Sequence, residues 1–82
     1  MTVPDDFHDR VAMIVADMFG ISRDEVSADL GYGAIQPWDS VGHLDLLLAL
    51  ERAFGFEMTA DLIPRLTSVR AIEEFLTNRV AA

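Results

Sequence analysis

Apolar residues recur every three or four positions in three separate segments of this chain, and no stretch alternates for long enough to form a strand. The first segment is residues 5–19, between Pro4 and Gly20, the second is residues 40–54, and the third begins at about Ser68. Each segment is predicted to form an amphipathic helix. The 82 residues are predicted to form a single domain, because neither half alone could build a core.

The connection between the first two helices, residues 21–38, contains two glycines and a proline and is longer than most helix–helix loops. Ser22 followed three residues later by Glu25 is the pattern of a capping box, so we expect one helical turn in this loop. The residues expected to anchor the rest of the loop are Leu30, Tyr32, Ile35 and Trp38.

A short helical turn is predicted before the last helix. Thr59 can cap a turn at residues 60–63, and Pro64 is expected to end it because proline cannot continue a helix. The last helix then presents one apolar face, formed by Val69, Ile72, Phe75, Leu76 and Val80. The predicted fold class is therefore all-α, a small four-helix bundle of three long helices and one short one, with a long first loop.

The composition excludes several classes of function. Six basic residues against fourteen acidic ones give a net charge of −8, which repels nucleic acids and anionic membranes and favours basic partner surfaces. The absence of cysteine excludes disulfides, thiol nucleophiles and Cys-ligated zinc. The chain shows neither a signal peptide nor an apolar run approaching the roughly 18 residues of a membrane span, so we expect a cytoplasmic protein.

The second predicted helix is apolar on two sides. One arc, expected to face the core, carries Leu46, Leu47, Leu50, Ala53 and Phe54. The opposite arc carries Val41, Leu44 and Leu48 interleaved with Asp45, Glu51 and Arg52. A helix in so small a bundle can hardly be buried all round, so either some of these apolar side chains form an exposed docking patch or the long first loop folds over them.

The segment Pro37-Trp38-Asp39-Ser40 stands at the start of this helix. Serine and aspartate are both common N-cap residues, so either Asp39 or Ser40 is expected to cap it. A helix N-terminus also stabilises a phosphate ester, because its free N–H groups and dipole favour negative charge. A modified Ser40 would therefore be well placed.

Three features in register resemble the acyl carrier protein family over nearly the whole chain: Asp39-Ser40-Val41, the Glu51-to-Phe54 spacing, and Thr67-Ser68-Val69 before the last helix. In that family an Asp-Ser-Leu motif opens the second of four helices, and its serine receives 4′-phosphopantetheine from coenzyme A. The resemblance implies that Ser40 is the attachment site, with Asp39 capping the helix or contacting the transferase. It also implies a non-catalytic carrier that holds acyl groups as thioesters.

The resemblance also implies partners. These are a phosphopantetheinyl transferase acting with magnesium, an acyl-loading ligase or acyltransferase, and a ketosynthase or other biosynthetic enzyme. The docking residues expected on the carrier, which is expected to be monomeric, are Val41, Leu44, Asp45, Leu48, Glu51, Asp61 and Leu62.

The sequence departs from the housekeeping fatty-acid carriers at several positions. Val41 replaces the usual leucine, and Gly42 and Arg52 stand where those carriers commonly have acidic residues. Residues 38–44 look more like the discrete carriers of polyketide, nonribosomal peptide or other secondary pathways. An acyl or small-acid cargo is favoured over an aminoacyl one.

Other readings of the same residues are an unmodified helical interaction module, a peptidyl or aminoacyl carrier, and a hydrolase with a triad of Asp39, Ser40 and His43. The hydrolase is disfavoured because the Gly-x-Ser-x-Gly elbow is absent and so short a chain leaves little room for a cleft. His43 is expected at the boundary between core and solvent, and His8 on the outside of the first helix.

A calcium site is also disfavoured. The acidic residues Asp24, Glu25 and Asp29 do not follow the alternating ligand spacing of an EF-hand loop, so no metal site is expected.

Overall fold

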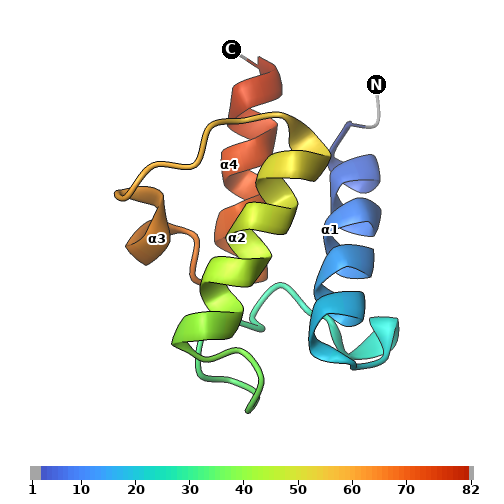
Figure 1. The fold of residues 1–82 in the computed structure, drawn as a ribbon. Coiled ribbons are helices and arrows are strands. Elements are labelled where there is room, and N and C mark those ends of the chain that lie inside the picture. Colours follow the sequence, from blue (N-terminus) through green and yellow to red (C-terminus); the bar gives the residue numbers. More distant parts are fainter. Residues whose placement is uncertain (1–2, 82) are drawn as a thin grey trace.

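Three long helices lie side by side in the computed structural model, which describes the backbone of residues 3–81 and the side chains of residues 7–79 (Figure 1). The elements in chain order are α1 (Val3–Phe19), η1 (Arg23–Glu25), α2 (Ser40–Phe54), α3 (Leu62–Arg65) and α4 (Val69–Ala81). Helices α2 and α4 run in the direction opposite to α1, and α3 lies beside α2 on the side away from α1. No strand occurs within residues 3–81, so the predicted all-α bundle is confirmed.

The core lies where α1, α2 and α4 meet. It is built from aliphatic and aromatic side chains of all three helices, with Val26 and Trp38 added from the first loop. Trp38 is fully buried and stacks on Phe19 of α1, with ring centroids 5.1 Å apart. The loop therefore contributes to the core and fixes the entry to α2. The predicted Val80 contact lies outside the described side chains.

The buried arc of α2 differs from the predicted one. Leu46, Leu47 and Leu50 are fully buried as expected, but Ala53 is exposed. The arc continues at its N-terminal end with His43, which is only 3% exposed. The expectation that His43 lies at the boundary with solvent was therefore wrong, because both nitrogens of its ring find partners inside the protein.

The short helix α3 begins two residues later than predicted. Pro64 lies inside α3 and does not end it, because the backbone N–H that proline lacks has no partner in the first turn of a helix. Thr59 does not cap it either, since its hydroxyl donates to the carboxylate of Asp61. Leu62, the first residue of α3, is buried.

The first loop forms the predicted capping box. The hydroxyl of Ser22 accepts from the backbone N–H of Asp24, and the Glu25 carboxylate accepts from the N–H of Ser22 at 2.8 Å. The middle of the loop is bonded to the start of α4, where the N–H of Val69 donates to the carbonyl of Leu30 at 2.8 Å. These bonds hold the loop along the ends of the helices.

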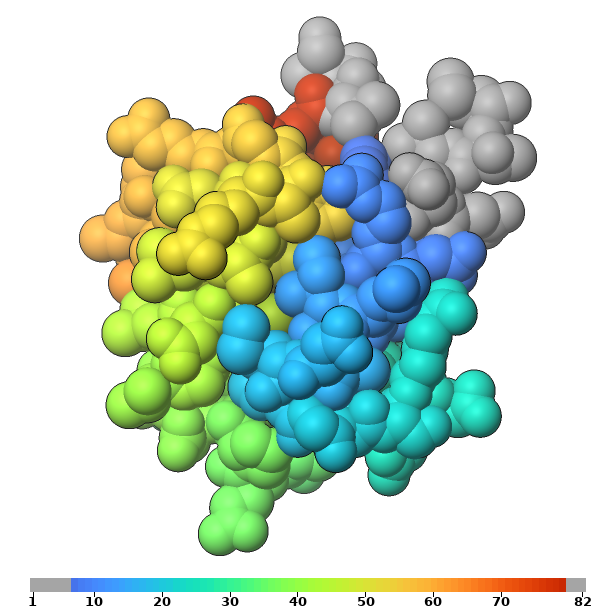
Figure 2. Space-filling model, turned by 45° about the vertical axis from the view of Figure 1, so that its right-hand side comes forward, coloured from blue at the N-terminus to red at the C-terminus, as the bar shows by residue number. Residues whose placement is uncertain are grey.

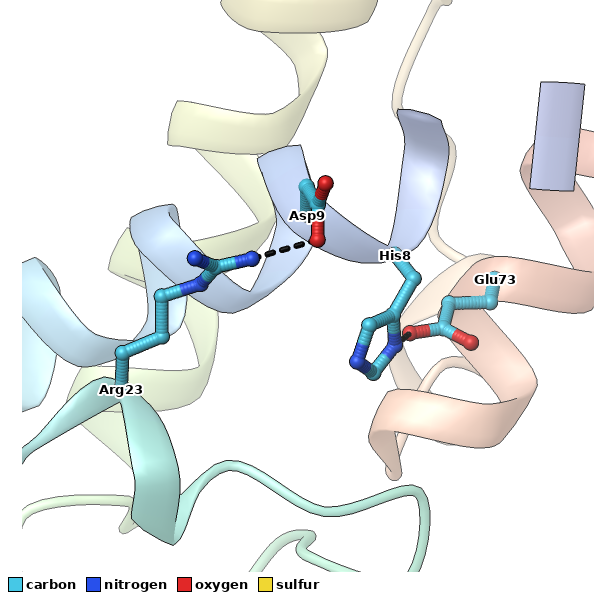
Figure 3. A network of polar contacts seen from close by, with 4 residues as sticks. All are labelled: His8, Asp9, Arg23 and Glu73. Atoms are coloured by element: carbon cyan, nitrogen blue, oxygen red, sulfur yellow. Dashed lines mark hydrogen bonds and ion pairs between the residues drawn. The ribbon is translucent and has the colours of Figure 1, made fainter. Parts of the chain in front are cut away.

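Two neighbouring residues of α1 make polar contacts that connect this helix to η1 and to α4 (Figure 3). Asp9 accepts from Arg23 of η1, and His8 lies 2.6 Å from the carboxylate of Glu73 on α4. Three of the four side chains are about half exposed or more, so each pair contributes little to stability. Within the described residues, no helix has the length and apolar character needed to cross a membrane.

Candidate functional site

Ser40 is the first residue of α2, and its side chain is not used to cap the helix. Asp39 is the N-cap, and its Oδ1 accepts from the backbone N–H of Gly42 at 2.9 Å. This settles which of the two candidate residues caps α2. The Ser40 side chain is exposed at a helix N-terminus whose first N–H groups favour negative charge.

Gly42 is required by close packing. A Cβ atom at this position would lie 2.2 Å from the carbonyl oxygen of Pro37 and 3.1 Å from the ring of Phe19. No side chain fits there unless the loop moves away from the first turn of α2. The lack of an acidic side chain at Gly42 therefore has a structural reason.

The hydroxyl of Tyr32 lies 2.9 Å from Oγ of Ser40, and either atom can donate. Tyr32 is 50% exposed, so it anchors the loop through its backbone bond to Thr67 and not through burial of its side chain. Its ring instead meets His43 edge-on, with centroids 5.6 Å apart and planes at 66°. Tyr32 comes from the loop and no motif marks it, so its place beside Ser40 could not be predicted from the sequence.

His43 joins three parts of the chain. Its Nδ1 accepts from the indole N–H of Trp38 at 3.0 Å, and its Nε2 lies 2.7 Å from the carbonyl oxygen of Ile63 on α3. An indole N–H can only donate and a carbonyl can only accept, so these partners place the ring proton on Nε2. The two bonds thus fix the orientation of the buried ring.

This network is incompatible with the hydrolase reading. Both ring nitrogens of His43 are bonded to residues other than Ser40, and the Asp39 carboxylate caps the helix. Neither is therefore available to Ser40 as a base or as an orienting carboxylate.

A groove of about 330 Å³ opens beside Ser40, between α2 and α3. It is mainly apolar, and its lining residues are Tyr32, Ser40, His43, Leu44, Ile63, Pro64 and Thr67. A larger hollow of about 480 Å³ lies along α4, away from Ser40, and is lined mostly by polar and charged side chains. The groove next to Ser40 is the one suited to a partly apolar group attached there.

The outer face of α2 is open. Val41 is 69% exposed, Leu44 and Leu48 are each 41% exposed, and Asp45 is exposed beside them. We call these four residues the α2 patch. The first loop lies beside α1 and below α2 (Figure 2), and the exposure of the patch residues shows that the loop does not cover them. The expectation of exposed apolar side chains is therefore confirmed, and the alternative of a covering loop was wrong.

The other predicted docking residues differ from one another. Glu51 is half-buried, and its carboxylate accepts from the backbone N–H of Met58 at 3.0 Å. Asp61 is exposed, and the hydrogen bond from Thr59, helped by Arg65, holds the pKa of its carboxyl below the ordinary value. Leu62 cannot supply an exposed docking contact because its side chain packs into the core, so this prediction was wrong.

No cluster of three or more His, Cys, Asp or Glu side chains that could hold a metal ion occurs in the part of the chain that the structure describes. Two of the acidic residues of the first loop have structural partners. Glu25 completes the capping box, and Asp29 pairs with Arg70 of α4.

Comparison with known proteins gives one consistent result, although no family model matches the chain. The chain is 30% identical over 74 residues to an acyl carrier protein of Thermosynechococcus vestitus, covering 90% of this chain and 91% of that protein. It is also 30% identical over 76 residues to acyl carrier protein 2 of Pseudomonas aeruginosa, covering 93% and 96%. An acyl carrier protein of Guillardia theta is 24% identical over 74 residues, covering 90% and 91%.

Proposed function

The chain belongs to the acyl carrier protein family, and on this premise we propose that Ser40 bears a 4′-phosphopantetheine arm carrying acyl groups as thioesters. The observation that carries this proposal is the state of the Ser40 side chain. It is exposed at the start of α2, free of any capping role, and beside an apolar groove.

The residues around Ser40 fit a phosphodiester. The first turn of α2 offers backbone N–H groups and the positive end of the helix dipole, and the nearby hydroxyl of Tyr32 can donate. The bound arm would supply a thiol, which this chain lacks because it contains no cysteine.

In the modification step, Oγ of Ser40 attacks the phosphorus of coenzyme A that bears the pantetheine. The new Oγ–P bond forms as the bond to adenosine 3′,5′-bisphosphate breaks, and the Oγ proton passes to a base of the transferase. The transferase holds magnesium against the pyrophosphate, whose charge the metal neutralises.

The α2 patch is proposed to dock the partner enzymes: the transferase, an acyl-loading ligase or acyltransferase, and a ketosynthase or other biosynthetic enzyme. Its apolar side chains are already exposed, so they dock without rearrangement of the carrier. The net charge of −8 would speed encounter with basic partner surfaces. Asp61, and Glu51 in part, are proposed to extend the acidic rim.

The cargo is proposed to be an acyl or small-acid unit of a secondary pathway. The support is the similarity of residues 38–44 to the discrete carriers of such pathways. In this structure, Trp38 and His43 of that segment act together in one buried hydrogen bond.

The proposed attachment is tested by the intact mass of the protein before and after incubation with coenzyme A, magnesium and a broad-specificity phosphopantetheinyl transferase. The wild type is expected to gain one phosphopantetheinyl group and Ser40→Ala none. Ser27→Ala, which removes an exposed hydroxyl of the first loop, is the matched control and should gain the group.

A wild-type protein that starts unmodified and gains no mass would overturn the proposal. The α2 patch would then favour the unmodified interaction module. A loaded aminoacyl group in place of an acyl group would overturn the cargo class alone.

A further inference from the structure

The backbone of Tyr32 is held on both sides. Its N–H donates to the carbonyl of Thr67 at 2.8 Å, and the N–H of Gly33 donates to the carbonyl of Trp38 at 3.0 Å. A Cβ atom on Gly31 would lie 2.3 Å from that same Thr67 oxygen, so the loop packs tightly against the segment before α4. Tyr32 is therefore fixed in position relative to α2 and α4.

The side chain of Tyr32 is oriented toward Ser40 by its contact with His43. Its ring meets the edge of His43, which the hydrogen bonds from Trp38 and to Ile63 hold in place. The tyrosine hydroxyl then reaches Oγ of Ser40 at 2.9 Å. Both side chains are exposed, so water can replace this bond, and the fold does not depend on the hydroxyl.

We infer that Tyr32 is a positioning residue that binds the phosphodiester formed at Ser40 and directs the attached arm toward the groove between α2 and α3. The inference rests on the proposed function, because it needs a phosphodiester at Ser40. Before modification either hydroxyl can donate to the other. Once Oγ is esterified it has no hydrogen, so the Tyr32 hydroxyl becomes the donor.

The acceptor after modification is Oγ itself or an anionic oxygen on the same phosphorus. A hydrogen bond from a hydroxyl to an anionic oxygen is shorter than a neutral one and about twice as strong. The contact between Tyr32 and Ser40 therefore strengthens when the protein is modified.

The direction of the arm follows from the place of the tyrosine. Tyr32 forms one wall of the groove, and Leu44, Ile63 and Pro64 form others. A phosphodiester bonded to Tyr32 is held on the groove side of Ser40. The Tyr32 hydroxyl thus biases the arm toward the groove and away from solvent.

The test uses the modified protein and needs no partner enzyme once modification is complete. The chain contains one tyrosine, and the modified protein contains one phosphorus atom. Phosphorus NMR then reports the phosphodiester alone, and selective labelling of tyrosine reports Tyr32 alone. The variants are Tyr32→Phe, which removes only the hydroxyl, and Gln36→Ala, a control at an exposed position in the same loop.

The phosphorus resonance of Tyr32→Phe is expected to shift from that of the wild type, and that of Gln36→Ala to coincide with the wild type. Nuclear Overhauser effects between the labelled Tyr32 ring and the methylene beside the phosphate are expected in the wild type and in Gln36→Ala, which both keep the tyrosine. Both variants should unfold at the wild-type temperature.

A modified wild type whose phosphorus resonance is the same in Tyr32→Phe, with no contact between ring and arm, would overturn this inference alone. A wild type that gains no phosphopantetheinyl group would overturn the proposed function, and the inference with it. The mass measurement distinguishes the two failures.

Discussion

Trp38 and His43 are joined by a buried hydrogen bond of 3.0 Å between the end of the first loop and the first turns of α2. The opposite nitrogen of His43 bonds the carbonyl of Ile63 on α3. One imidazole ring thus connects the loop before Ser40 with both helices that border the groove.

Replacing His43 should therefore destabilise the protein even when the new side chain is apolar and of similar size, because both hydrogen bonds of the ring are lost. His43→Leu leaves the buried indole N–H of Trp38 and the partly buried carbonyl of Ile63 without their partner. The expected loss is about 2–4 kcal/mol of unfolding free energy, because a buried unsatisfied polar group costs roughly 1–3 kcal/mol. Urea unfolding measures it.

The matched control is the other histidine described, His8, whose side chain is about half exposed. His8→Leu should change the unfolding free energy by no more than about 0.5 kcal/mol. If His43→Leu were as stable as the wild type, the network would have no structural importance.

Truncating Asp39 should destabilise the protein, whereas truncating its neighbour Ser40 should leave the stability nearly unchanged. Asp39→Ala removes the N-cap bond to Gly42 and is expected to cost about 1 kcal/mol of stability. Ser40→Ala removes no cap and should cost less than about 0.5 kcal/mol, while abolishing the mass gain. Thermal unfolding of both variants, with the mass assay, checks the assignment; a larger loss for Ser40→Ala would reverse it.

The α2 patch should affect modification by the transferase without affecting the fold. Leu48→Gln is expected to lower kcat/KM for the transferase about tenfold, since losing one good interface contact costs on the order of 1–2 kcal/mol. Met13→Gln is the matched control, because Met13 is an exposed apolar residue of α1. Equal losses in the two variants would mean that the patch has no special part in docking.

The stability of the protein should depend on pH through Asp61, the residue before α3. Its pKa is lowered by the Thr59 hydrogen bond first, with Arg65 contributing, while partial desolvation opposes the shift. A carboxyl whose folded-state pKa lies below its unfolded value stabilises the fold above the unfolded pKa. That stabilisation is lost as the pH falls through the folded pKa.

Thr59→Val should accordingly raise the pKa of Asp61, as NMR titration of its carboxyl would show. The stability difference from the wild type should be present at neutral pH and vanish in strong acid. Thr77→Val on α4 is the control and should leave the Asp61 titration unchanged. A pKa of Asp61 that does not move in Thr59→Val would contradict the assigned cause.

Local patterns were sufficient to predict the three long helices and the place of Ser40 at the start of the second. The bounds of α2 follow from an uninterrupted apolar period after Asp39, and the capping box at Ser22 and Glu25 marks η1. These features depend on residues within four positions of one another, so the sequence determines them directly. The similarity to acyl carrier proteins rests on such short segments in register.

The surroundings of Ser40 depend on contacts between distant segments. Periodicity alone could not decide that His43 is buried, because this depends on Trp38 and Ile63 meeting the His43 ring. Burial of Leu62 is likewise decided by how the short α3 packs against the core.

By itself the sequence determined the three long helices and the position of a serine at the N-terminus of the second. Only the tertiary structure brought Tyr32 to Ser40, through a backbone bond to Thr67, thirty-five residues further along the chain (67 − 32 = 35). The physical reason is that helix periodicity and caps act over one or two turns. Partners in a small core are chosen by packing among all the elements at once.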